Sequence, residues 1–194
     1  MKQTLTMTPE QMNARIFRFR DRRVHMNYTE DRSIPQAAYD AVNPPFSLLL
    51  APVAAGTPES SRPAIAGASG LSVAIFELQP GQKVPLHVHF RSHEAYVCLK
   101  GRVKFRWSDN GEHQAILEPF DMIDFPLGLY RDFQCADDEV AMILGIVTDP
   151  QDDYPGDIVV APHERAEFVE RFGPEVVERL SASTGLNLNV CDEE

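Results

Sequence analysis

The sequence predicts an all-β fold, a barrel or sandwich of short antiparallel strands, with short helices in an arm at each end. From Gly70 to about Val147, apolar stretches of strand length alternate with turn signals every ~8–12 residues. Nothing of helical length interrupts this series, and Asn110-Gly111 is a strong hairpin signal. Helical patterning is confined to the two ends of the chain.

The composition indicates an ordinary globular protein with a small ligand. The chain has 194 residues, 43% hydrophobic and 24% charged, which is enough for one sizeable core. Its net charge of -11 argues against nucleic acid or an anionic membrane surface as the main partner. Any attraction for an anionic ligand must therefore come from a few local cations.

Cysteine use and hydropathy predict a cytoplasmic protein. Cys98, Cys135 and Cys191 are far apart and form no C-x-x-C pair, so they make no disulfide framework. The first residues contain no continuous apolar stretch with a small-residue cleavage pattern, so we expect no signal peptide. No stretch reaches the ~18 apolar residues of a membrane span.

Residues 1–60 are expected to form an arm that packs on the barrel or on a partner subunit. Thr8 before Pro9, with Gln11 three residues after Thr8, predicts a helix start with a capping box. The alternating residues 16–20 predict a short edge strand. Further along, we expect a short helix around 33–42, a buried strand over 46–53 and a loop over 54–70.

Residues 61–148 are expected to form the barrel. The predicted strand regions are 71–82, 84–90, 94–101, a hairpin over 102–118, 122–128, 130–135 and 139–147. Residues 149–194 should form a C-terminal extension with two short helices, separated at Gly173-Pro174. These helices carry an apolar stripe of Phe168, Val169, Phe172, Val176, Val177 and Leu180, which would close one end of the barrel or pack on a partner.

A histidine cluster supplies the candidate metal ligands. On a strand, residues two apart face the same way, so His87 and His89 should project together. If the chain reverses around residues 90–92, Glu94 returns opposite the two imidazoles. Two histidines and one carboxylate suit a divalent first-row transition metal and leave coordination positions open.

The same alternation places the neighbouring residues. His93 directly precedes Glu94, so it cannot share the face of Glu94 in an extended segment and is expected in solvent. Tyr96 and Cys98 fall on the side of Glu94. Tyr96 is either a core aromatic or a hydroxyl donor to a substrate, and Cys98 is expected to be a small buried thiol.

This spacing resembles a known family. Gly81, five residues, His87, one residue, His89, four residues, Glu94, six residues and Gly101 are similar to the complete first motif of the cupin superfamily. A looser version of the second cupin motif follows at residues 120–133, with a Pro-x-Gly turn. The resemblance covers about residues 70–147 and implies a double-stranded β-helix, or jelly roll.

The chain departs from the family at two positions of the second motif. The position that usually supplies a fourth ligand, a histidine, holds Arg131, and the glycine that opens the motif is replaced by Phe120. Arginine has no lone pair for a metal, which limits the implied ligands to His87, His89 and Glu94. A slip of one residue would instead bring Tyr130 or Asp132 inward, so the fourth position stays open.

Arg131 has two readings. Its planar fork binds carboxylates, so it could anchor an anionic group of a small organic acid beside the metal. Alternatively, it pairs with Glu94, Asp124 or another carboxylate of the barrel wall, and then the arginine rather than a metal neutralises Glu94.

The resemblance implies a metal-dependent enzyme acting on a small anionic organic substrate, with a non-haem dioxygenase as the first hypothesis. His87, His89 and Glu94 would hold the metal, Arg131 would position the substrate, and Tyr96 would polarise it or move a proton. Iron(II) is the first choice, and manganese, nickel or zinc fit the same donors. The alternatives are a non-catalytic binding module and a lyase or isomerase of the same fold. We also expect a homodimer.

Overall fold

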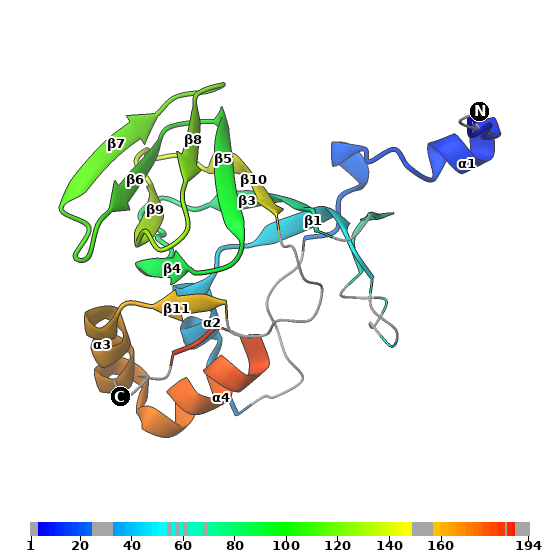
Figure 1. Ribbon diagram of the computed structural model, residues 1–194. Coiled ribbons are helices and arrows are strands. Elements are labelled where there is room, and N and C mark those ends of the chain that lie inside the picture. Colours follow the sequence, from blue (N-terminus) through cyan, green and yellow to red (C-terminus); the bar gives the residue numbers. More distant parts are fainter. Residues whose placement is uncertain are drawn as a thin grey trace.

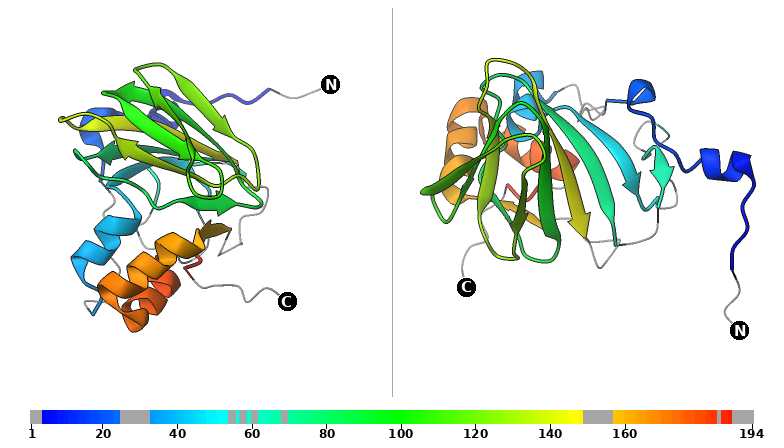
Figure 2. Two further views of the ribbon diagram at one scale, coloured as in Figure 1. Left: turned by 90° about the vertical axis from the view of Figure 1, so that its left-hand side faces the viewer. Right: turned by 90° about the horizontal axis from the view of Figure 1, so that it is seen from above.

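The computed structural model describes residues 4–24, 33–53, 56, 59, 62–67, 70–148, 157–184 and 186–188. Over these residues the protein consists of two facing β-sheets with helices gathered at one end (Figures 1 and 2). The prediction of an all-β fold with short helices near both ends is confirmed.

The first sheet has six strands. Their order is β2 (Ile65–Ala66), β1 (Phe46–Ala51), β3 (Ser72–Leu78), β10 (Ala141–Thr148), β5 (His93–Lys100) and β8 (Met122–Phe125). All pairs in it are antiparallel except the parallel pair of β1 and β2. The strands that intervene in sequence between β3, β5, β8 and β10 belong to the other sheet, so the chain crosses between the sheets several times, as in a jelly roll.

The second sheet has five strands. Their order is β11 (Ile158–Val160), β4 (His87–His89), β9 (Arg131–Cys135), β6 (Val103–Trp107) and β7 (His113–Leu117). The predicted hairpin is β6 and β7, and Gly111 in its turn has a φ of 68°, which glycine adopts without strain. The two sheets place β4 and β5, which carry the candidate ligands, on opposite walls.

An aromatic cluster fills the space between the sheets. Tyr96 of the first sheet lies 5.4 Å from Phe105 and 5.0 Å from Phe133 of the second, measured between ring centroids. Phe125 of β8 also contacts Tyr96 and Phe105. These rings are nearly inaccessible to water, so burial of their apolar surface stabilises the barrel.

A second apolar core joins the helices to β11. Helix α2 (Gln36–Val42) packs with α3 (Pro162–Phe172) and α4 (Pro174–Thr184) on the end of the barrel (Figure 1). Gly173 separates α3 from α4 with a φ of 84°, and its N–H donates to the Val169 carbonyl. The predicted pair of C-terminal helices and their break are therefore confirmed.

The N-terminal segment is partly as expected. Helix α1 (Pro9–Asn13) begins at Thr8 with the predicted capping box to Gln11, and it projects away from the barrel (Figures 1 and 2). The predicted edge strand over 16–20 is wrong, because that segment pairs with no strand and ends in a 3-10 helix (Phe19–Asp21). Arg22 accounts for the turn, since its guanidinium lies over the Phe19 ring and binds Glu77.

The predicted loop over 54–70 contains β2, and several of its residues lie outside the described ones. No helix among the described residues is long and apolar enough to cross a membrane.

Candidate metal centre

Three buried side chains converge between the two sheets. His87 and His89 project from β4, the chain turns at residues 90–92, and Glu94 follows on β5. One ligand atom from each of these three side chains can be chosen such that all three atoms lie within 4.8 Å of one another. The convergence of two imidazoles and a carboxylate is thus as the alternation predicted, although β4 and β5 belong to different sheets.

Hydrogen bonds orient both imidazole rings. Nδ1 of His87 lies 2.7 Å from the Pro85 carbonyl oxygen. That oxygen only accepts, so Nδ1 carries the proton and Nε2 keeps its lone pair. Nδ1 of His89 faces Ser92 Oγ at 2.5 Å and Asp157 Oδ2 at 3.1 Å. In each ring, Nδ1 therefore has a hydrogen-bond partner.

The inner nitrogen of His89 is the unsatisfied atom of the site. Nε2 of His89 is buried without a hydrogen-bond partner among the described residues, and it lies 3.8 Å from Glu94 Oε2. Burying a polar nitrogen without a partner costs free energy, so a buried orphan calls for an explanation. A cation bound between His89 and Glu94 would provide one.

Both imidazoles are neutral near pH 7. Burial, together with the charge of Arg131, lowers the pKa of His87 to about 3. Burial also lowers the pKa of His89, against the opposing effect of the Glu94 carboxylate. Neutral imidazole is the form that binds metals, so the environment prepares both rings for coordination.

Arg131 resolves one alternative that the sequence left open. It lies on β9 opposite His87, and Nη2 and Nε are 2.7 and 3.2 Å from Glu94 Oε2. Asp132 instead binds Arg106, so it is Arg131 that points to the cluster. Tyr130 is only half-buried. Burial is the largest effect on the pKa of Glu94 and would raise it. The Arg131 charge, together with the two imidazoles and the hydrogen bond from Tyr96, lowers this pKa on balance.

Tyr96 is a core aromatic, which is one of the two roles expected for it, and its hydroxyl lies at Glu94. Its ring is 2% exposed within the aromatic core, and its hydroxyl forms a hydrogen bond with Glu94. Burial and the nearby Glu94 charge raise the pKa of Tyr96 well above its ordinary value. Tyr96 therefore stays protonated and acts as a hydrogen-bond donor.

A small cavity opens beside these residues. Its volume is about 100 Å³ and its walls are mainly apolar. The barrel contributes Phe76, Val84, Pro85, His87, His89, Glu94, Tyr96 and Phe133, and the rest comes from Val42, Asn43, Ile158, Val160 and Leu186. An apolar cavity of ~150 Å³ holds benzene, so this space suits a smaller ligand.

The residues fit a divalent transition metal. One nitrogen of each imidazole and one carboxylate oxygen can lie within 4.8 Å of one another, and Nδ1 of each ring is hydrogen-bonded, as is usual for histidine ligands of metals. The carboxylate is shared, because Glu94 Oε2 also accepts from Arg131. The donor set is therefore that of a two-histidine, one-carboxylate site in which the Arg131 guanidinium lies next to the carboxylate.

Sequence reasoning missed two residues of the site, Ser92 and Asp157. Asp157 precedes β11 and is 68 positions after His89, so no local pattern connects them. Ser92 lies in the turn that was predicted only as a reversal. Ser92 and Asp157 both contact the His89 ring, and Asp157 also binds the backbone of the turn; these contacts form only when the chain has folded.

The other candidates lie apart from the cluster. His93 and His113 are exposed, as the alternation predicted for His93, and His93 Nδ1 lies 3.2 Å from Asp124. Cys98 is fully buried, with its Sγ toward the carbonyls of Lys100 and Gly101. Cys191 lies outside the described residues.

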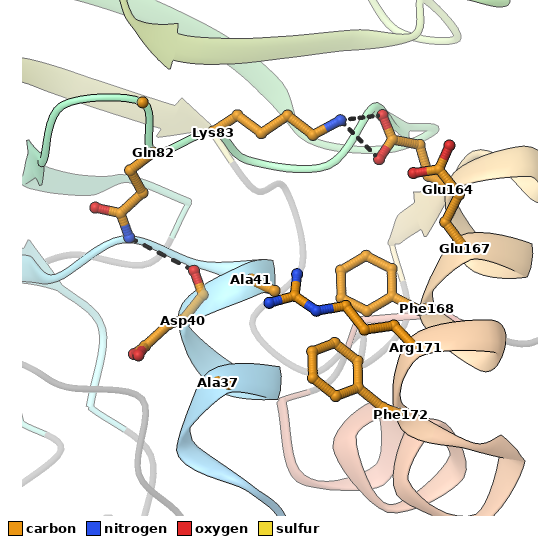
Figure 3. A pocket seen from close by; sticks show the side chains of 11 residues that line it. Ala37, Asp40, Ala41, Gln82, Lys83, Glu164, Glu167, Phe168, Arg171 and Phe172 are labelled. Carbon is orange, nitrogen blue, oxygen red and sulfur yellow. Dashed lines mark hydrogen bonds and ion pairs between the residues drawn. The ribbon is translucent and has the colours of Figure 1, made fainter.

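A larger cleft lies between α2 and α3. Its volume is about 390 Å³, and Figure 3 shows charged side chains around two neighbouring phenylalanines, Phe168 and Phe172, whose rings are tilted by 32°. Two of the charges are paired, since Lys83 Nζ lies 2.8 Å from one Glu164 oxygen and 3.0 Å from the other. Among the described residues, the cluster of possible metal ligands lies at His87, His89 and Glu94 and not in this cleft, so the candidate metal centre is the smaller cavity.

The fold and the site together define a double-stranded β-helix protein with a candidate metal centre. Residues 74–147 match the family model described as the Cupin domain. Over these residues the resemblance to the cupin superfamily that the histidine spacing predicted is confirmed. No curated protein matches the chain in sequence.

Several solved structures resemble part of the chain. A DMSP lyase of Ruegeria pomeroyi is 17% identical, over 69% of this chain and 59% of its own, with a TM-score of 0.49. A conserved protein with a double-stranded β-helix domain from Klebsiella pneumoniae is 15% identical, over 48% and 76%, with a TM-score of 0.42. The protein KdgF of a Halomonas species is 15% identical, over 46% and 79%, with a TM-score of 0.41.

Proposed function

We propose that the protein is a metal-dependent enzyme acting on a small anionic organic substrate, and that its reaction is that of a non-haem dioxygenase. The observation that carries the proposal is the convergence of His87, His89 and Glu94 in a buried cavity, with the unpartnered Nε2 of His89 beside the Glu94 carboxylate. This donor set leaves coordination positions open, as dioxygenases of this type require.

His87, His89 and Glu94 would hold the metal, with iron(II) preferred and manganese, nickel or zinc compatible with the same donors. When bound, the metal would supply dioxygen activation or Lewis acidity. The small cavity with apolar walls would exclude water around a bound ligand.

Arg131 and Tyr96 have supporting roles in this proposal. The Arg131 guanidinium holds Glu94 by charge-assisted hydrogen bonds, and its positive charge favours an anionic group nearby. Glu94 lines the cavity, and Arg131 forms its ion pair with the Glu94 carboxylate. Direct anchoring of the substrate by Arg131 therefore stays a prediction. Tyr96, which lines the cavity and keeps its proton, would donate a hydrogen bond to the substrate or to Glu94.

The ion pair favours a second candidate, a metal-free binding module. Arg131 already compensates the buried Glu94 charge, so the pair needs no metal for neutrality. In that case the cavity would bind a small ligand without chemistry, and His87→Ala would leave the affinity nearly unchanged.

Metal content separates these two candidates. Protein purified without added metal should contain close to one equivalent of a transition metal by elemental analysis, and the variants His87→Ala and His89→Ala should lose it. His163→Ala, at an exposed position of α3, is the matched control and should keep it. Absence of metal from wild-type protein that also takes up no added iron(II) would favour the binding module.

Oxygen use tests the reaction class. Iron(II)-loaded protein should consume dioxygen in the presence of one of a panel of small carboxylic acids, measured with an oxygen electrode. Turnover of the same acid under anaerobic conditions would contradict the dioxygenase assignment and favour a lyase or isomerase.

A further inference from the structure

Asp157 is tied to the turn between the two ligand-bearing strands. It lies outside the matched domain, directly before β11, which pairs with β4. Its Oδ1 accepts from the backbone N–H groups of Phe90 at 3.0 Å and Arg91 at 2.7 Å, and its Oδ2 accepts from that of Ser92 at 3.0 Å. One carboxylate thus holds the whole reversal from β4 to β5.

The same carboxylate controls the proton on His89. Oδ2 of Asp157 lies 3.1 Å from His89 Nδ1 and also accepts from the Ser92 hydroxyl. Because Ser92 gives its only hydroxyl hydrogen to Asp157, it can only accept from His89. Both atoms that face Nδ1 are therefore acceptors, and the ring proton resides on Nδ1.

We propose that Asp157 is a positioning residue that fixes the Nδ1–H tautomer of His89 and thereby presents the Nε2 lone pair to the candidate metal centre. Only the metal-binding consequence rests on the proposed function, since the tautomer is a property of the metal-free protein. A histidine with a proton on Nε2 cannot bind a metal through that atom, so loss of Asp157 weakens the site without removing a ligand.

The Ser92 hydroxyl sets the direction in which the His89 tautomer changes when Asp157 is lost. Without Asp157, the Ser92 hydroxyl is free to donate its hydrogen to His89 Nδ1, 2.5 Å away, which drives the ring proton to Nε2. His87 is independent of this exchange, because the Pro85 carbonyl sets its tautomer. His87 therefore serves as an internal reference in the same molecule.

The tautomers can be observed in metal-free protein labelled with ¹⁵N-histidine, by long-range ¹H–¹⁵N correlation spectra. In the wild type, both His87 and His89 should show a protonated Nδ1 and an unprotonated Nε2. Asp157→Ala should move His89 toward the Nε2–H form and leave His87 unchanged. Ser92→Ala keeps the carboxylate, so it should keep the wild-type tautomer of His89. An unchanged His89 spectrum in Asp157→Ala would overturn the proposal.

A second variant protects the test against misfolding. If Asp157→Ala does not fold, Asp157→Asn keeps one oxygen for the Phe90 and Arg91 amides and offers an N–H₂ donor in place of Oδ2. That donor facing Nδ1 should also produce the Nε2–H tautomer. Retention of Nδ1–H in folded Asp157→Asn would likewise count against Asp157 as the determinant.

Metal titration then separates this inference from the proposed function. With zinc or cobalt as the probe, Asp157→Ala should bind ~10–100-fold more weakly than the wild type, while His163→Ala should bind equally well. A tautomer change in a protein whose wild type binds no metal supports the role of Asp157 and refutes the metal-dependent enzyme. Equal metal affinity together with an unchanged tautomer refutes the role of Asp157 alone.

Discussion

Phe120 occupies a backbone position that favours glycine. Its φ is 78°, in the left-handed region, and its side chain is 85% exposed. A side chain with a Cβ atom is strained there by about 1–2 kcal/mol, and an exposed ring recovers little of this through packing. The departure from the glycine of the family motif thus has a definite structural cost.

Phe120→Gly should therefore stabilise the protein. Relief of strain, less the ~0.5–1 kcal/mol that glycine loses in backbone entropy, predicts a gain of about 0.5–1 kcal/mol in the free energy of unfolding. Urea denaturation measures it. Leu127→Gly is the matched control, since Leu127 is exposed but is not among the described residues with positive φ, and it should destabilise. A loss of stability in Phe120→Gly would contradict the strain.

Stability of the metal-free protein should fall in acid because of His87. Its pKa is about 3 in the fold, against 6.5 for the free side chain, so the unfolded state binds more protons between these values. The contribution of His87 is fully present above pH 6.5 and is lost as the pH falls toward 3, by up to about 5 kcal/mol at 1.36 kcal/mol per pKa unit. The lowered pKa of Glu94 acts in the same direction.

Urea denaturation of metal-free protein at several pH values between 7 and 4 measures this dependence. His87→Gln, which does not titrate, should show a shallower decrease than the wild type. Equal slopes in the two proteins would mean that His87 is protonated in the folded state.

At the scale of single residues, the sequence predicted which groups face one another but not how they pair. The two-residue alternation placed His87, His89 and Glu94 together because it is a local property of strands. The partner of Arg131 could not be derived, because a substrate anion and a wall carboxylate satisfy a buried guanidinium equally well. Only the fold shows its bond to Glu94.

At the scale of elements, β10 carries a close contact with the site. Gly145 pairs with Tyr96 of β5, and a Cβ added there would lie 2.8 Å from Phe76 Cε2 and 3.2 Å from Tyr96 Cε1. Both rings belong to the packed aromatic core and have little space to move. The absence of a side chain at position 145 thus permits the placement of Tyr96.

Gly145→Ala should destabilise the protein by about 1–3 kcal/mol, through overpacking against these rings. Thermal or urea denaturation measures the loss. Phe76→Leu in the Gly145→Ala background shortens the nearer side chain and should recover part of the loss relative to the sum of the single changes. If the stability losses of Gly145→Ala and Phe76→Leu simply add in the double variant, the two positions do not interact.

Elements were predictable where their signals are local. Turn residues and alternation gave the strands of the barrel, and the Gly173 break gave the two C-terminal helices. Residues 16–20 alternate equally well but form no strand, because a strand also needs a neighbour with free backbone groups. The order of strands in each sheet and the link from Asp157 to β4 depend on long-range contacts that no local pattern encodes.

At the scale of the whole molecule, the described part of the N-terminal segment, residues 4–24, packs little against the rest of the protein. Helix α1 buries none of its residues, and Leu5, Met12 and Ile16 are 83%, 53% and 47% exposed. Exposed apolar side chains on a projecting segment are typical of contacts between subunits. We therefore propose that the protein forms a homodimer through this segment.

Deletion of residues 1–18 should convert the dimer to a monomer, since these residues carry most of the exposed apolar side chains of the segment. Light scattering coupled to size-exclusion chromatography measures the mass. Met12→Ser combined with Ile16→Ser should weaken the dimer without shortening the chain, while Ile116→Ser on β7, which is 52% exposed, is the control. A monomeric full-length protein would contradict the proposal.

The cavity beside the histidines is walled partly by Val42 near the N-terminal side and by Ile158, Val160 and Leu186 near the C-terminal side. The donors for a metal lie on β4 and β5, whereas these outer walls come from chain segments on either side of the matched domain. In the proposed enzyme, part of the cavity wall would therefore be encoded apart from the candidate metal ligands. Codons 42 and 186 encode wall residues that lie on neither β4 nor its partner β11, so changes at these two codons would reshape the cavity without replacing a candidate ligand.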